Sequence, residues 1–93
     1  MNKEFIILKE FDKQWHAMGL FDDDLRRLEF EILHHPELGV VIPGTGGLLK
    51  RRFAFEGSGK SGSARVCYVD FIYAEKVVLI TAYPKNAKDN LSK

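Results

Sequence analysis

Helical periodicity is clearest between residues 23 and 34. Apolar residues recur there at spacings of three, four and one, which places them on one face of a helix. They are Leu25, Leu28, Ile32 and Leu33. Asp22, Asp23 and Asp24 stand at the start, where carboxylates cap free N–H groups and suit the positive end of the helix dipole. Pro36 cannot continue the run. The pattern predicts a helix over 23–34.

Two shorter elements precede this helix. Residues 4–9 hold a brief β-favouring apolar run, and residues 11–18 have helical spacing closed by Gly19. Phe11, Trp15 and Met18 share one face of that helix, so we expect them in the core. The N-terminal part of the chain is therefore predicted to be a strand followed by two helices.

The pattern becomes β-like after a glycine-rich connection over 37–47. Val, Ile, Phe and Tyr are concentrated in three runs, at 49–55, 64–73 and 76–83, and only Ala74-Glu75 separates the last two. The predicted order is β-α-α-β-β-β, an α+β sandwich with two helices on one side of a sheet of about four strands. With 93 residues and no linker, the chain is predicted to be a single domain over 1–93 with a lean core.

Charge is divided unevenly although the net charge is only +1. Residues 1–49 hold five Lys or Arg against nine Asp or Glu, whereas residues 50–93 hold nine against four. An acidic half joined to a basic half suggests a basic working face for a phosphate-rich partner. No apolar run is long enough for a membrane span or a signal peptide, so we expect a cytoplasmic protein without a membrane partner. Cys67 is unpaired and lies in a strand-like run, where a buried, inert thiol is expected.

The basic residues cluster in two glycine-bordered segments, 44–55 and 59–68, and a Tyr-Pro-Lys-Asn corner follows at 83–86. Lys50 and Arg52 are two positions apart and so face the same side of a strand. If the segments form neighbouring strands, one anionic ligand can be contacted by four cations. They are Lys50, Arg52, Lys60 and Arg65.

Two other functional interpretations, a nucleotide-binding loop and a metal site, do not agree with the surrounding sequence. The run ending in Gly59-Lys60-Ser61 loosely fits a P-loop, but a P-loop must open a helix and this run continues as a strand. His34, His35 and Glu37 could suggest a metal, yet adjacent histidines point apart on a helix. A helix-end charge role is favoured for them, and no cofactor or metal is expected.

An ordered set of motifs resembles a known family. They are Pro36-Glu37-Leu38-Gly39, Ile42-x-Gly44-Thr45-Gly46-Gly47-Leu48-x-Lys50-x-Arg52, Gly59-Lys60-x-Gly62-x-x-Arg65-Val66-x-Tyr68 and Tyr83-x-Lys85-Asn86. Together they resemble the RelE/HigB toxins of bacterial type II toxin–antitoxin systems, especially the HigB-like branch. The resemblance implies a compact β-α-α-β-β-β fold that cleaves mRNA in the ribosomal A site. It also implies a cognate antitoxin, often of the helix-turn-helix type.

Metal-free RNA cleavage by the 2′-hydroxyl requires charge stabilisation and proton transfer, both of which basic side chains can supply. We assign Arg65 and Arg52 to the scissile phosphate, and Lys50 and Lys85 to proton transfer. Two further basic residues, Arg51 and Lys60, are expected to steer the RNA backbone. Several relatives have a tyrosine, histidine or aspartate after the last strand as an added acid or base. In this chain Asn86, Lys88 and Asp89 stand there, and Tyr83, slightly earlier, is a possible acid or base.

The chain ends at Lys93, near where related toxins commonly start a C-terminal helix, so we expect that helix to be missing. This departure leaves two hypotheses open. The first is a ribosome-dependent endoribonuclease, and the second is a non-catalytic relative that binds RNA or an antitoxin and takes part in operon autoregulation.

Overall fold

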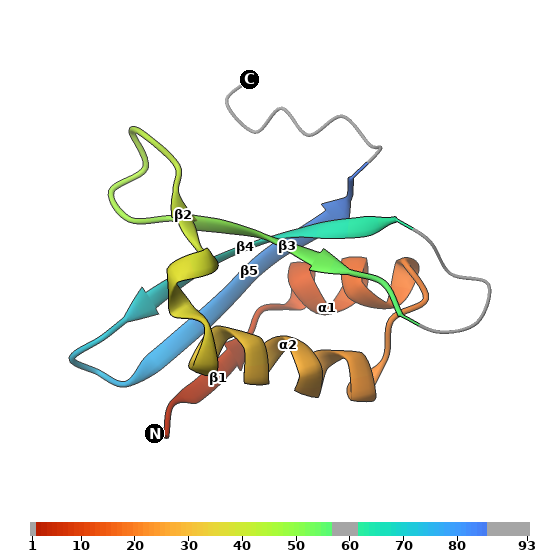
Figure 1. Cartoon of the computed structure of the whole chain (residues 1–93), viewed down its shortest axis with the longest axis horizontal. Helices are drawn as coiled ribbons and strands as arrows, with labels where there is room; N and C mark the ends of the chain where they lie inside the picture. Colours follow the sequence, from red (N-terminus) through yellow and green to blue (C-terminus); the bar gives the residue numbers. More distant parts are fainter. Residues whose placement is uncertain (1, 57–61, 86–93) are drawn as a thin grey trace.

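The computed structural model describes residues 2–56 and 62–85 (Figure 1). Its elements follow the expected order, with one additional short strand. They are β1 (Glu4–Ile7), α1 (Lys9–Ala17), α2 (Asp22–His34), the 3-10 helix η1 (Pro36–Leu38), β2 (Val40–Val41), β3 (Leu49–Ala54), β4 (Ser63–Phe71) and β5 (Lys76–Pro84). The α+β fold class is confirmed.

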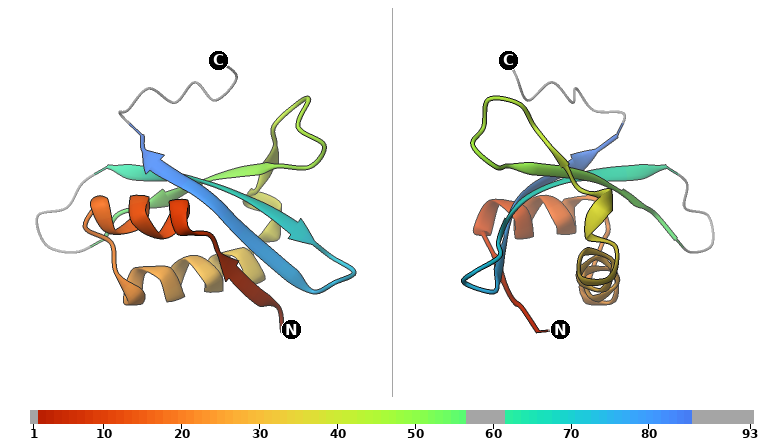
Figure 2. Two further views of the ribbon diagram at one scale, coloured as in Figure 1. Left: turned by 180° about the vertical axis from the view of Figure 1, so that it is seen from behind. Right: turned by 60° about the vertical axis from the view of Figure 1, so that its left-hand side comes forward.

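Within the described residues the sheet has five strands in the order β1-β5-β4-β3-β2. β1 runs parallel to β5, and the other pairs are antiparallel. Both helices lie on one face of this sheet, and within residues 2–56 and 62–85 the other face carries no helix (Figure 2). The unexpected fifth strand, β2, is only two residues long, and it exists because Val40 and Val41 pair with Lys50 and Leu49.

The core fills the space between the helices and the sheet. Its fully buried side chains come from both helices and from the three long strands, and they include Phe11, Trp15, Leu28, Phe53, Val66, Val77 and Leu79. The Trp15 ring lies 5.2 Å from Phe11 and 5.1 Å from Phe53, and its indole N–H donates to the carbonyl of Phe21. Met18 packs against this cluster, so the predicted helix face is confirmed.

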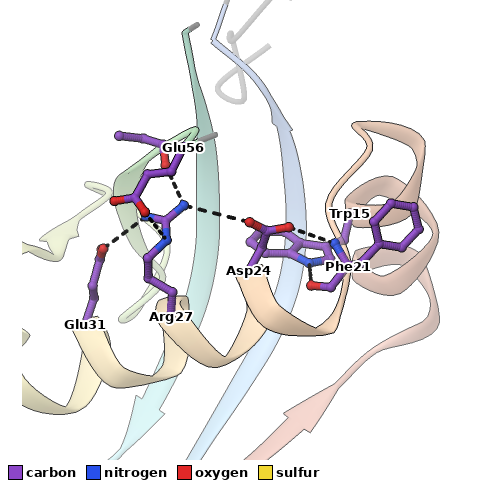
Figure 3. Close-up of polar contacts among 7 residues, drawn as sticks. Trp15, Phe21, Asp24, Arg27, Glu31 and Glu56 are labelled. Carbon is purple, nitrogen blue, oxygen red and sulfur yellow. Dashed lines mark hydrogen bonds and ion pairs between the residues drawn. The ribbon is translucent and has the colours of Figure 1, made fainter. Parts of the chain in front are cut away.

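The start of α2 is stabilised as the aspartates suggested. The Asp24 carboxylate accepts a hydrogen bond from the Phe21 N–H at 3.0 Å, one residue before the helix begins. This bond satisfies a backbone donor at the turn that joins the two helices (Figure 3).

Arg27 ties α2 to the end of β3. Its guanidinium lies 4.0 Å from the centroid of the Phe53 ring and donates to the Ala54 carbonyl at 2.9 Å. It also forms ion pairs with Glu31 at 3.4 Å and with Glu56 at 3.5 Å (Figure 3). These contacts hold β3, the strand that carries Lys50, Arg51 and Arg52, in place against the helix layer.

The β4–β5 connection differs from the expected two-residue link. β4 ends at Phe71, and Ile72 to Glu75 form a four-residue turn with positive φ at Glu75. The β-favouring side chains of Ile72 and Tyr73 made the strand seem longer, but they are exposed beyond the last paired residues. The expectation about the C-terminal helix concerns residues 86–93, which lie outside the described residues.

Candidate functional site

The pleat of the sheet separates the basic residues onto two faces. Arg51 pairs with Val66, whose side chain is part of the helix-facing core. One position further along, Arg52 pairs with Arg65, and Arg65 pairs in turn with Tyr83. Since directly paired residues share a face and successive residues alternate, this second row points away from the helices.

Three of the four residues assigned to catalysis line one concavity of about 340 Å³ on the sheet. They are Lys50 and Arg52 from β3 and Arg65 from β4. Leu38, Val40 and Arg51 complete the lining. The predicted convergence of basic side chains from neighbouring strands therefore occurs for these three.

The two arginines leave hydrogen-bonding capacity for an anion. Arg52 donates from Nε to the Ser63 hydroxyl at 3.3 Å. The Nη1 atom of Arg65 is shielded from solvent and has no hydrogen-bond partner within residues 2–56 and 62–85. A buried guanidinium N–H without a partner is costly. Arg65 also lines the concavity, so an anion there would lie beside its positive charge.

Lys85 and Tyr83 lie at the adjacent strand end. The Lys85 side chain is exposed, and its backbone N–H donates to the Ser63 carbonyl at 2.9 Å. That bond tethers Lys85 to the first residue of β4, two positions from Arg65. Tyr83 is largely buried in the row that contains Arg65 and Arg52. Neither residue is among those that line the concavity, and Tyr83 neighbours it through its pairing with Arg65.

Arg51 is not the exposed residue that the expected RNA-steering role implied. Its side chain is only 1% exposed and lies on the helix side of the sheet, where it donates to the His35 carbonyl at 3.2 Å. The carboxylate of Glu31 is 3.8 Å away. The charge in the sequence suggested a solvent-exposed residue, but the pleat and the end of α2 draw it inward. Lys60, the other expected RNA-steering residue, lies outside the described residues.

Sequence reasoning missed the apolar wall of the site. Leu38 and Val40 belong to the connection after α2, which was expected to have little regular structure. The sequence feature that could have indicated this ordered segment is the Pro36–Gly39 motif. A Cβ added to Gly39 would clash with the Tyr68 hydroxyl oxygen, so a larger residue here would force the buried Tyr68 side chain to shift.

Cys67 is buried, as expected, and it pairs across the strands with Lys50. Burial raises the pKa of its thiol, and the nearby Lys50 charge offsets part of that rise. The thiol is therefore protonated at neutral pH and sits beside the concavity as a small apolar group.

Within the part of the chain that the structure describes, no group of three or more His, Cys, Asp or Glu side chains could hold a metal ion. The helices described there are also too short and too polar to cross a membrane.

Comparison with known proteins gives two findings. The structure of an E. coli RelE double mutant in the free state is similar in fold, with a TM-score of 0.64 and 17% sequence identity. The alignment covers 99% of this chain and 93% of that toxin. A family described as "RelE toxin of RelE / RelB toxin-antitoxin system" matches residues 9–93. The chain therefore belongs to the RelE toxin family and is a RelE-like toxin of a toxin–antitoxin system.

Proposed function

We propose that this toxin inhibits translation by cleaving mRNA in the ribosomal A site. The observation that carries the proposal is the concavity in which Lys50, Arg52 and Arg65 meet. Phosphoryl chemistry needs positive charge placed where negative charge develops, and a partly shielded site strengthens that effect. Membership of the RelE toxin family supports RNA as the source of the phosphate.

In the proposed reaction the 2′-oxygen of one nucleotide attacks the adjacent phosphorus, and the bond from phosphorus to the 5′-oxygen of the next nucleotide breaks. The products are a 2′,3′-cyclic phosphate and a free 5′-hydroxyl. Arg65 and Arg52 hold the phosphate and stabilise its added negative charge. Lys50 and Lys85 carry out the two proton transfers, from the 2′-hydroxyl and to the departing 5′-oxygen, and Tyr83 is an alternative group for one of them.

We expect the ribosome to align the RNA for cleavage, because the described residues that line the toxin's concavity include no strong general base. The concavity is lined by cations and aliphatic side chains, without a carboxylate or imidazole among the lining residues to act as a strong general base. Aligning the 2′-oxygen with the leaving oxygen must therefore come from the A site, and such positioning can contribute roughly 7–11 kcal/mol in favourable cases. We expect little cleavage of free RNA.

The test is to incubate the purified toxin with an mRNA, with and without programmed ribosomes, and to map the new 5′ ends. Cleavage should require the ribosome and should be lost in Arg65→Met. Lys76→Met is the matched control, because Lys76 pairs with Glu4 at the far end of β5. Efficient cleavage of free RNA would refute ribosome dependence. Ribosome or RNA binding without any cleavage would favour a non-catalytic binding module.

We propose a helix-turn-helix antitoxin as the partner, with an acidic segment that orders on the cationic concavity. A small helix-turn-helix protein encoded in the adjacent reading frame would support this pairing. The antitoxin should raise the Tm of the toxin and slow hydrogen exchange along β3 and β4. A tight complex in which Arg52 and Arg65 remain open would contradict this mode of neutralisation.

A further inference from the structure

We propose that Leu38 and Val40 form a wall that contacts a nucleobase of the RNA bound at the cationic concavity. The inference rests on the proposed function and names the part of the substrate that this side of the site takes. Both side chains line the concavity, yet they are 56% and 64% exposed. Exposed aliphatic side chains beside a cluster of cations are not needed for binding a phosphate alone.

The register places the apolar and cationic groups next to each other. Val40 pairs directly with Lys50, so their side chains leave the same face of the sheet as neighbours. A nucleotide has the matching chemistry, because it joins an anionic phosphate to a flat base with an apolar face. When Lys50, Arg52 and Arg65 hold the phosphate, the attached base can cover the two aliphatic side chains.

The wall is held in place before any ligand arrives. The His35 carbonyl at the end of α2 accepts hydrogen bonds from the Leu38 N–H at 3.1 Å and from the buried Arg51 guanidinium at 3.2 Å. Gly39 packs directly on the Tyr68 hydroxyl. These contacts fasten η1 to both α2 and the sheet, so little conformational freedom is lost when a base binds.

The apolar character of the wall predicts which bases it prefers. Leu38 and Val40 offer no side-chain hydrogen bonds to a base edge, so selection there depends on the area of base that they cover. A purine covers more apolar surface than a pyrimidine, and burial contributes about 25 cal/mol per Å². We therefore expect a preference for a purine at the nucleotide that the wall contacts.

The variants that test this are Leu38→Asn and Val40→Thr, which keep side-chain size and replace apolar surface with polar atoms. Val41→Thr is the matched control. Val41 is 57% exposed on the same two-residue strand, but it pairs with Leu49, points to the opposite face and does not line the concavity.

The measurement is cleavage on programmed ribosomes, with an intact mRNA and with mRNAs that carry one abasic nucleotide in the A-site codon. For the intact message we expect the half-saturating concentration to rise about fivefold to tenfold in each test variant, with kcat little changed, because the lost contact is an apolar one of modest area. One abasic position should weaken the wild type at least as much as either variant does, because it removes the contact with both side chains, and it should abolish the difference between wild type and variant. Val41→Thr should behave as wild type.

Two results would contradict the proposed base contact. One is that the test variants weaken cleavage of intact and abasic messages equally at every position. The other is that Val41→Thr weakens cleavage as much as the test variants do. If the wild type cleaves no message, the proposed function fails separately. The contact between the wall and a base is then tested by fluorescence anisotropy, which measures binding of a short 2′-O-methyl RNA and its abasic counterparts. Loss of affinity confined to the intact RNA supports it, and identical affinities of wild type and variants refute it.

Discussion

Arg52 and Arg65 occupy directly opposite positions of β3 and β4 on the open face of the sheet. Like charges in directly opposite positions destabilise a pair of strands. The arrangement also leaves Nη1 of Arg65 shielded and without a hydrogen-bond partner among the described residues. The folded toxin therefore holds two cations in a geometry that an anion would stabilise.

Replacing Arg65 by methionine should separate activity from stability. The variant retains the length and apolar stem of the side chain but removes the repulsion and the unpaired buried donor. We expect an unfolding free energy equal to wild type or higher by about 0.5–1 kcal/mol, together with loss of growth arrest on induction. Urea denaturation and a growth assay measure the two effects. A loss of stability of about 2 kcal/mol or more would contradict this account.

The opposite orientations of Arg51 and Arg52 predict different responses to salt. Arg52→Met should remove one phosphate contact and reduce the slope of log K against log salt by about 0.7 for single-stranded RNA. Arg51→Leu should leave the slope unchanged, because its guanidinium faces the His35 carbonyl and Glu31. Binding of a short RNA at several salt concentrations tests both. A reduced slope in Arg51→Leu would show that Arg51 reaches the RNA.

Gly39→Ala should be destabilising through a single contact. The added methyl group would lie 2.2 Å from the Tyr68 hydroxyl oxygen and 3.3 Å from the ring carbon that bears it. Overpacking of this kind typically costs about 1–3 kcal/mol. Tyr68→Phe removes the closest atom, so the double variant should recover much of the loss. The measurement is a double-mutant cycle on the unfolding free energy, and simple additivity of the two changes would argue against the contact.

Cys67 should be chemically silent in the folded toxin. Its side chain is buried and burial raises its pKa, so alkylation by iodoacetamide at pH 8 should be far slower than in urea. Because the folded pKa lies above the unfolded value of about 8.5, the stability linked to the neutral thiol is present below that pH and is lost as the pH rises further. The stability difference between wild type and Cys67→Ala should therefore shrink at high pH. Rapid native-state alkylation would contradict the burial.

Local sequence patterns were sufficient for most of the fold. The spacing of Leu25, Leu28 and Ile32, the aspartates before them and Pro36 after them define α2 through interactions within a few residues. The β-branched and aromatic content of the three long strands and the alternation of Lys50 and Arg52 are local in the same sense. These features predicted the element order and placed two cations on one face.

Only the tertiary structure decided which face of the sheet Lys50 and Arg52 occupy and which side chains lie beside them. Arg51 and Arg52 are chemically identical and adjacent, and one is buried because the end of α2 places the His35 carbonyl and Glu31 where only it can reach them. Val40 becomes part of the site through two residues of pairing with β3, which are too few to leave a periodic signal. The local pattern therefore determined the elements and their cations. Long-range packing and strand pairing decided which cations reach the open face and which apolar side chains border them.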